Sequence, residues 1–191
     1  MNRMQLLMIA TLLFCFPGVV AAQLQPTIET SRSYLRSTIK ALPPAEGRSL
    51  LQYLDAGRSA ADEGMRLCAE SKTDALYESM SADFKNKYSL EQFRQLSQMF
   101  ERAAGKIISY EYRNQALSYP IDNTPLSELG QAKSNVWYAI KTTKLSGEGI
   151  FMQVKTVRAG DKHVVSFINF VNYGDNIPPW LLRPDAPSTR K

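Results

Sequence analysis

The spacing of apolar residues changes at Gly105, from the period of about 3.6 expected of a helix to the period of 2 of a strand. Before Gly105, apolar side chains recur on one helical face. After it they alternate with polar ones, as along a half-buried strand. A helix stripe and a sheet face must each be buried against another element. The sequence therefore predicts an α+β domain whose N-terminal helices pack on a curved four-stranded antiparallel sheet.

Three helices are predicted before Gly105. The main one begins near Glu46 and continues through Cys68, and a short one covers about Thr73–Met80. The third begins at a capping box, in which the side chains of Ser89 and Gln92 each bond the backbone N–H of the other residue. Gly105 is placed to end this helix as a left-handed cap.

Two glycines interrupt the main helix. Each of Gly57 and Gly64 is expected to weaken it by roughly 1 kcal/mol relative to alanine. The sequence alone gives no reason for their presence.

Four strands are predicted after Gly105. The first runs through Ala116, and the others cover about Lys133–Leu145, Ile150–Arg158 and Lys162–Tyr173. Short turns join the last three, so we expect an antiparallel meander. The turn-forming stretch from Pro120 to Gly130 predicts a loop between the first strand and the second.

Residues 1–22 have the layout of a secretory signal peptide. Arg3 gives a positive start, an apolar run covers Leu6–Phe16, and small residues precede a cleavage site near Ala22. The run is about half the roughly 20 residues that span a bilayer, so we expect cleavage and no stable membrane anchor. Cys15 would be removed with it. The mature protein is expected in the periplasm or outside the cell.

Two flanking segments surround the expected domain of residues 46–174. The arm, residues 23–45, has weakly helical spacing between Thr27 and Leu42, and the two prolines that follow would end such a helix. The tail, residues 175–191, is proline-rich. Its apolar patch, Trp180 to Leu182, is expected to fold back onto the domain.

Charge and composition narrow the partners. Loss of Arg3 with the signal peptide lowers the net charge from +5 to about +4, and the basic residues are scattered. We therefore expect no nucleic-acid partner. The partner class that fits export is another exported protein or a second copy of this chain.

Few side chains offer catalytic or metal chemistry. His163 is the only histidine, so a site of two or three histidines is excluded. Cys68 is the only cysteine after residue 22, so no internal disulfide is expected, and its helical position favours burial. Nucleophilic catalysis would need His163 as its base, on a strand beside a turn. The sequence therefore predicts no catalytic residue, no metal site and no cofactor.

Several segments resemble the helical half of exported nuclear-transport-factor-2-like domains of bacteria. They are Leu76–Lys85, Tyr88–Phe93, Gly105–Ile107 and Tyr110–Tyr112, and the resemblance extends over roughly residues 48–171. It implies a cone-shaped fold in which helices and a strongly bent sheet enclose a pocket.

The resemblance also directs attention to that pocket. Enzymes of this fold commonly place an Asp base and a Tyr or Asp donor there. Glu111 is the only acid within the predicted strands, and alternation places it on the solvent side. The candidate pocket residues are therefore aromatic: Tyr110, Tyr112, Tyr138, Phe93 and Phe100. In the alternative interpretation, rings such as Phe93 and Phe100 simply fill the core.

The opposite sheet face carries a different set of side chains. Trp137, Lys141 and Lys155 predict an aromatic and basic partner surface, with Trp180 as a second contact. We therefore expect a non-catalytic exported binding or assembly module that acts through its sheet face. The alternative is a small apolar-ligand carrier, or a small-molecule enzyme, that uses the concave pocket.

Overall fold

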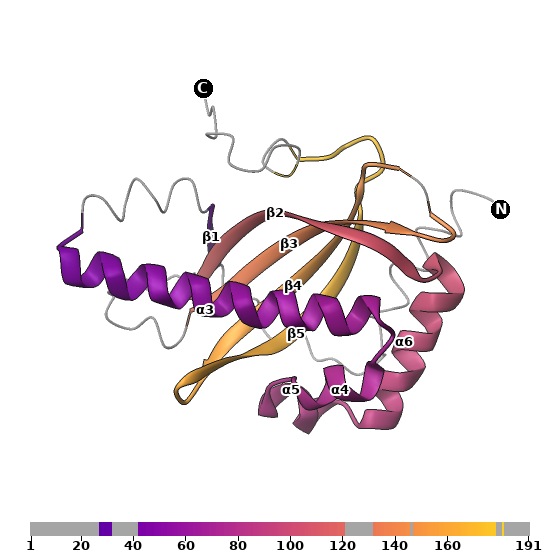
Figure 1. The fold of residues 1–191 in the computed structure, drawn as a ribbon, viewed down its shortest axis with the longest axis horizontal. Helices are drawn as coiled ribbons and strands as arrows, with labels where there is room; N and C mark the ends of the chain where they lie inside the picture. Colours follow the sequence, from indigo (N-terminus) through magenta and orange to yellow (C-terminus); the bar gives the residue numbers. More distant parts are fainter. Residues whose placement is uncertain (1–26, 32–41, 121–131, 146, 179–180, 182–191) are drawn as a thin grey trace.

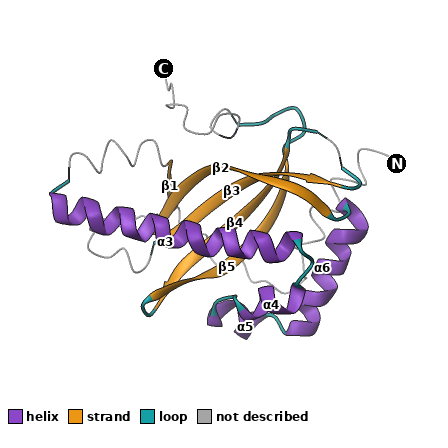
Figure 2. Ribbon diagram, in the orientation of Figure 1, coloured by secondary structure: helices purple, strands orange, loops and turns teal. Residues whose placement is uncertain are grey.

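Helices cover one face of a curved antiparallel sheet in the computed structural model, which describes residues 27–31, 42–120, 132–145, 147–178 and 181 (Figure 1). The strands lie in chain order, β1-β2-β3-β4-β5, and each is antiparallel to its neighbours. The long helix crosses the sheet, and the shorter helices gather at one end of it (Figure 2). The predicted α+β class is confirmed.

In the described part of the chain, four helices follow one another before the long strands. They are α3 (Pro44–Ala69), α4 (Thr73–Glu78), α5 (Ala82–Lys87) and α6 (Leu90–Ala104). The capping box of α6 is confirmed, since the Ser89 N–H donates to Gln92 Oε1 at 2.8 Å and the Gln92 N–H donates to Ser89 Oγ at 3.2 Å. Sequence analysis missed α5, which Ser81 caps by accepting from the Phe84 N–H.

The four predicted strands are confirmed as β2 (Ile107–Pro120), β3 (Lys133–Thr142), β4 (Ile150–Ala159) and β5 (Lys162–Asn172). Most of the predicted loop after Pro120 lies outside the described residues. The predicted signal peptide lies outside them as well. No helix in the described part of the chain is long and apolar enough to cross a membrane.

The predicted helical arm is wrong at Thr27–Ser31, which form β1. This strand pairs with residues 116–120 of β2. Its composition, two threonines and an isoleucine in five residues, suits an extended strand, and β2 offers it unpaired backbone groups. Pro44 also has a different role from the predicted one: it begins α3, at a position where the missing N–H costs no helical hydrogen bond.

Two glycines let α3 lie close to the sheet. A Cβ on Gly57 would lie 2.9 Å from Cβ of Ser134, and one on Gly64 would lie 2.8 Å from Cγ2 of Val165. Both distances are shorter than ordinary carbon contacts. The glycines that weaken the helix in isolation therefore permit its packing.

The opposite face of the sheet is partly covered by the end of the chain. Leu181 is fully buried and packs with Trp137 and Phe151, and Ile177 and Tyr173 pack against the same cluster. The predicted return of the apolar tail patch is therefore confirmed for Leu181. Trp180 and Leu182 lie outside the described residues.

We expect Gly64→Ala to destabilise the protein by about 1–2 kcal/mol, because the added methyl overlaps the β-branched Val165 side chain. Helix propensity alone predicts the opposite sign, a gain of about 1 kcal/mol. Urea unfolding of the two proteins measures the difference. In a Val165→Ala background the cost of Gly64→Ala should shrink, and an equally large cost there would contradict the packing explanation.

Candidate functional site

Four side chains from three elements meet where α3 crosses β2 and β3. The Arg58 cluster consists of Arg58, Asp62, Tyr112 and Tyr138. Nε of Arg58 donates to both carboxylate oxygens of Asp62, at 2.8 and 2.9 Å. The Tyr138 hydroxyl donates to Oδ1 of Asp62 at 2.6 Å. The Arg58 guanidinium carbon lies 3.5 Å from the centroid of the Tyr112 ring, a cation–π contact.

Simple geometry assembles this cluster. Arg58 and Asp62 are four residues apart on α3, so they share a helix face, at the border of its buried stripe. Tyr112 and Tyr138 lie directly opposite one another in the β2–β3 pairing, so they share a sheet face. Sequence analysis identified both tyrosines as candidates, but neither Arg58 nor Asp62. Arg58 and Asp62 are four residues apart and lie next to the buried Ala61, and this spacing was the sequence signal that could have identified them.

The electrostatics of the cluster hold both phenol and guanidinium in their ordinary charge states. Burial disfavours the charged guanidinium, but the hydrogen bond and negative charge of Asp62 leave the pKa of Arg58 above its usual value. Burial, followed by the hydrogen bond to Asp62 and its charge, raises the pKa of the Tyr138 hydroxyl. Tyr138 therefore remains a neutral donor at physiological pH.

An aspartate bonded to a tyrosine resembles the acid–base pair expected of a cone-fold enzyme. However, Tyr138 is only 1% exposed, and its proton is already directed to Asp62. Asp62 also accepts two hydrogen bonds from Arg58, and its side chain is 45% exposed. The arrangement fastens α3 to the sheet.

The five candidate pocket residues divide into two groups. Three tyrosine rings form one group: the ring centroid of Tyr138 lies 6.0 Å from that of Tyr110 and 6.5 Å from that of Tyr112. Phe93 instead packs against Phe84 and Tyr77, and Phe100 packs against Phe170. Phe93 and Phe100 therefore have the core role that the alternative interpretation assigned to them.

The predicted partner surface does not have the expected exposed aromatic side chain. Trp137 is only 5% exposed, because it packs in a cluster with Leu181 and Phe151. Lys141 is exposed and Lys155 is half-buried, so two separated lysines remain from that set. Trp180 lies outside the described residues.

Exposed apolar side chains occur instead on β2. Ile108 is 67% exposed and Tyr110 is 39% exposed. Strict alternation along β2 would place Ile108 on the same sheet face as Tyr110 and Tyr112. A β-bulge overturns this, since Ile107 pairs with Thr142 while Ser109 pairs with Lys141. The extra residue shifts the alternation, so Ile107 is buried and Ile108 points outward.

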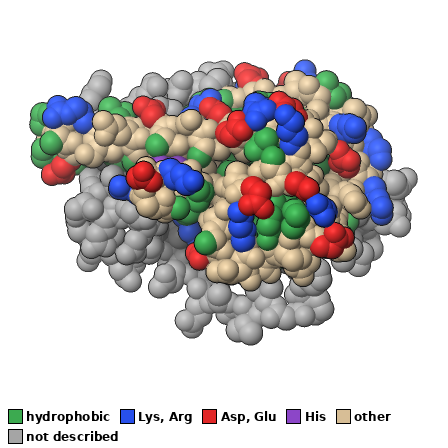
Figure 3. Space-filling view, turned by 60° about the horizontal axis from the view of Figure 1, so that its bottom comes forward, with side chains coloured by type: hydrophobic (Ala, Val, Ile, Leu, Met, Phe, Trp, Pro, Cys, Tyr) green, Lys and Arg blue, Asp and Glu red, His purple; other side chains and the backbone are tan. Residues whose placement is uncertain are grey.

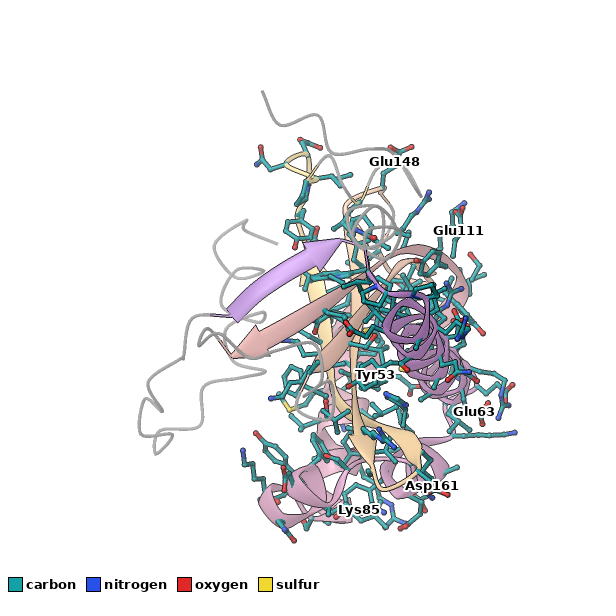
Figure 4. All side chains as sticks on the ribbon, turned by 90° about the vertical axis from the view of Figure 1, so that its left-hand side faces the viewer. Tyr53, Glu63, Lys85, Glu111, Glu148 and Asp161 are labelled. Atoms are coloured by element: carbon teal, nitrogen blue, oxygen red, sulfur yellow. The ribbon has the colours of Figure 1, made fainter. Side chains whose placement is uncertain are left out.

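These two side chains lie on the part of β2 beyond its described pairing with β1. β1 pairs only with residues 116–120 of β2. Among the described strands, only β3 pairs with residues 108–115, a segment we call the β2 edge. Glu111, on the same segment, points away from the sheet core, as predicted, whereas Tyr53 lies between α3 and the sheet (Figure 4).

Cys68 and His163 both lie in desolvated surroundings. Burial, with a smaller contribution from the charge of Glu101, raises the pKa of the Cys68 thiol to about 12. Burial and the charge of Arg158 lower the pKa of His163. Its ring centroid lies 4.4 Å from that of Tyr53, and the two rings are nearly perpendicular. Within the described residues, Nε2 of His163 is buried without a hydrogen-bonding partner.

Ionisable side chains elsewhere are dispersed. Lys and Arg side chains alternate with Asp and Glu over the helical face (Figure 3). In the described ranges, no three His, Cys, Asp or Glu side chains gather as a metal-binding group.

Comparison of the chain with protein-family models, with curated proteins and with solved structures finds no match. The candidate sites therefore rest on the geometry of this chain.

We expect Tyr138→Phe to destabilise the protein by about 1–2 kcal/mol, because a charge-assisted hydrogen bond to Asp62 is lost from a buried position. Tyr110→Phe, on the exposed neighbouring ring, is the matched control and should change stability by less than about 0.5 kcal/mol. Chemical denaturation measures both. Equal effects of the two substitutions would show that the Tyr138 hydroxyl contributes nothing specific.

We expect stability to decline as pH falls below about 6.5, the ordinary pKa of histidine. Because the pKa of His163 is lowered in the folded state, the unfolded state binds the proton more readily between the two values. Stability is therefore retained above pH of about 6.5 and lost toward the folded pKa. Thermal unfolding across pH 5.5–7.5 should show a flatter profile for His163→Phe. Parallel profiles for the two proteins would contradict this role.

Proposed function

We propose that this chain is an exported, non-catalytic binding or assembly module that uses the β2 edge as its contact surface. Export rests on the signal-like layout of residues 1–22. The partner class is another exported protein or a second copy of the chain.

One observation carries the proposal. Of the four large hydrophobic side chains exposed among the described residues, Ile108 and Tyr110 lie two positions apart on the β2 edge. Leu51 and Met99, the other two, lie on separate helices. Scattered apolar side chains are normal on a surface, but a neighbouring pair on one strand marks a candidate contact surface.

We also propose a nuclear-transport-factor-2-like frame for the domain. The order of the elements supports it, since helices precede a curved sheet and cover one of its faces. The helical segments that resemble the family correspond to α4, α5 and the start of α6. Strand β1 is an addition to the four-stranded sheet that the resemblance implies.

A carrier of small apolar ligands, or a small-molecule enzyme, is the second candidate. The Asp62–Tyr138 hydrogen bond favours it, because it places a carboxylate and a phenol between helix and sheet. The ring contacts of Phe93 and Phe100 count against it, since these side chains fill the helix–sheet interface.

Native mass spectrometry of the protein purified from the periplasm of its own host tests the proposal. We expect a co-purifying protein or a defined homo-oligomer, and we expect Ile108→Asp to abolish it. Ile108 is largely exposed, so the substitution should leave the fold intact. Met99→Asp, at an exposed apolar position on α6, is the matched control and should retain the partner.

Other outcomes separate the candidates. A monomer that carries a small-molecule adduct would favour the carrier and overturn the assembly proposal. Equal partner loss in both variants would remove the β2 edge as the contact surface. The mass also shows whether the mature chain begins near Gln23, and a chain that retains residues 1–22 would contradict export.

A further inference from the structure

Basic residues from two segments of the chain meet where α6 ends and β2 begins. The Lys144 N–H donates to the Ala104 carbonyl at 3.2 Å, and the Thr143 N–H donates to the Lys106 carbonyl at 2.9 Å, so the end of β3 lies against the turn after α6. Four exposed residues of these segments are basic, and we call them the basic end: Arg102, Lys106, Lys141 and Lys144. They are scattered in the sequence, and the fold gathers them.

The basic end is not used to hold the fold together by ion pairs. None of its four side chains forms an ion pair in the part of the chain that the structure describes, whereas helix cations such as Arg66 and Arg94 have carboxylate partners. Nζ of Lys144 donates to the Arg102 carbonyl at 2.7 Å, at the helix end that attracts a cation. The side-chain charges of the basic end are therefore available to a partner.

Nearby carboxylates leave an excess of positive charge at this end. Glu101 accepts a hydrogen bond from the Ser71 hydroxyl at 2.7 Å, and Glu148 is exposed in the turn between β3 and β4. Glu111, farther along β2, is paired with Arg113 at 2.8 Å, so these two charges offset each other. The four cations of the basic end outnumber the remaining two carboxylates.

The most exposed of the large hydrophobic side chains lies among these cations. Ile108 is 67% exposed and follows Lys106 by two residues. Its neighbour Ser109 faces Lys141 across the β2–β3 pairing, where adjacent strands lie about 5 Å apart. α6 ends and β2 begins at the right-hand end of the molecule (Figure 1), and Lys and Arg side chains lie along the same edge in Figure 3. An apolar centre with a charged rim is typical of protein–protein interfaces.

We infer that the partner of the β2 edge is an exported protein with an acidic surface, whose carboxylates meet the basic end while an apolar side chain packs on Ile108. This inference rests on the proposed function and names the chemistry of its partner. It also separates the two partner classes. A two-fold contact between copies through this surface places cations against cations, whereas an acidic surface offers the complementary charge.

Zero-length cross-linking tests which carboxylates meet the basic end. A water-soluble carbodiimide joins a lysine amine to a carboxylate in contact with it, through an amide bond. We expect the complex isolated from the periplasm of its own host to give cross-links from Lys106 and Lys141 to Asp or Glu of a different chain. Mass spectrometry of the joined peptides identifies both residues. Lys162 is equally exposed but lies in the β4–β5 hairpin, so it is the matched control and should give none.

Charge reversal and salt provide the second measurement. We expect Lys106→Glu and Lys141→Glu each to lower the fraction of chain recovered with its partner at least tenfold, because each places a carboxylate against an acidic surface. Lys162→Glu should leave the fraction unchanged. All three positions are exposed, so the variants should fold. Raising sodium chloride from about 0.1 to about 1 M shortens the screening length from about 10 to about 3 Å and should release the partner.

The outcomes separate this inference from the proposed function. Cross-links between two copies of the chain, or a partner that all three variants retain, overturn the acidic partner. If Ile108→Asp still abolishes binding in that case, the proposed function stands. A chain that is recovered alone and sediments with phosphatidylglycerol vesicles, but not with phosphatidylcholine vesicles, has a membrane surface as its occupant, and both proposals are then overturned. Both are also overturned by a chain that is recovered alone and binds neither kind of vesicle.

Discussion

The close approach of α3 to the sheet is the contact on which the rest of the structure depends. Gly57 and Gly64 present no side chain to the strands, so the helix axis can lie near Ser134 and Val165. That approach buries the apolar stripe of α3 against β3 and β4. It also brings Arg58 of α3 into contact with the tyrosine ring of Tyr112 on β2.

The same closeness determines how polar groups are accommodated in the helix–sheet interface. Gln115 is fully buried, and its amide donates to the Leu54 carbonyl at 2.7 Å and to Ser134 Oγ at 2.8 Å. The Tyr53 hydroxyl donates to the Ala132 carbonyl at 2.5 Å. Such buried bonds rigidify an interface because breaking any one leaves an unsatisfied group. The interface between α3 and the sheet is thus a rigid, hydrogen-bonded part of the core.

Strand β2 carries two of the exposed apolar side chains of the described residues. β1 pairs with residues 116–120 of β2, and the bulge at Ile108 turns an apolar side chain outward from the other half. Exposed apolar side chains on a strand near a sheet edge are normally a hazard of aggregation. Glu111 and Arg113 place charges beside them on the same strand, and such charges oppose indiscriminate pairing.

Local pattern in the sequence determined α3, α4 and α6, the capping box at Ser89, the four long strands and their meander order, because each depends on residues close together in the chain. The short helix α5 was missed. The tyrosines of the Arg58 cluster were predictable for the same reason. Tertiary structure alone decided the pairing of β1, the outward turn of Ile108, the burial of Trp137 and the meeting of Arg58 with Tyr112. Each of these follows from contacts between segments far apart in the chain, and apolar periodicity has no information about which distant segment will cover a given face.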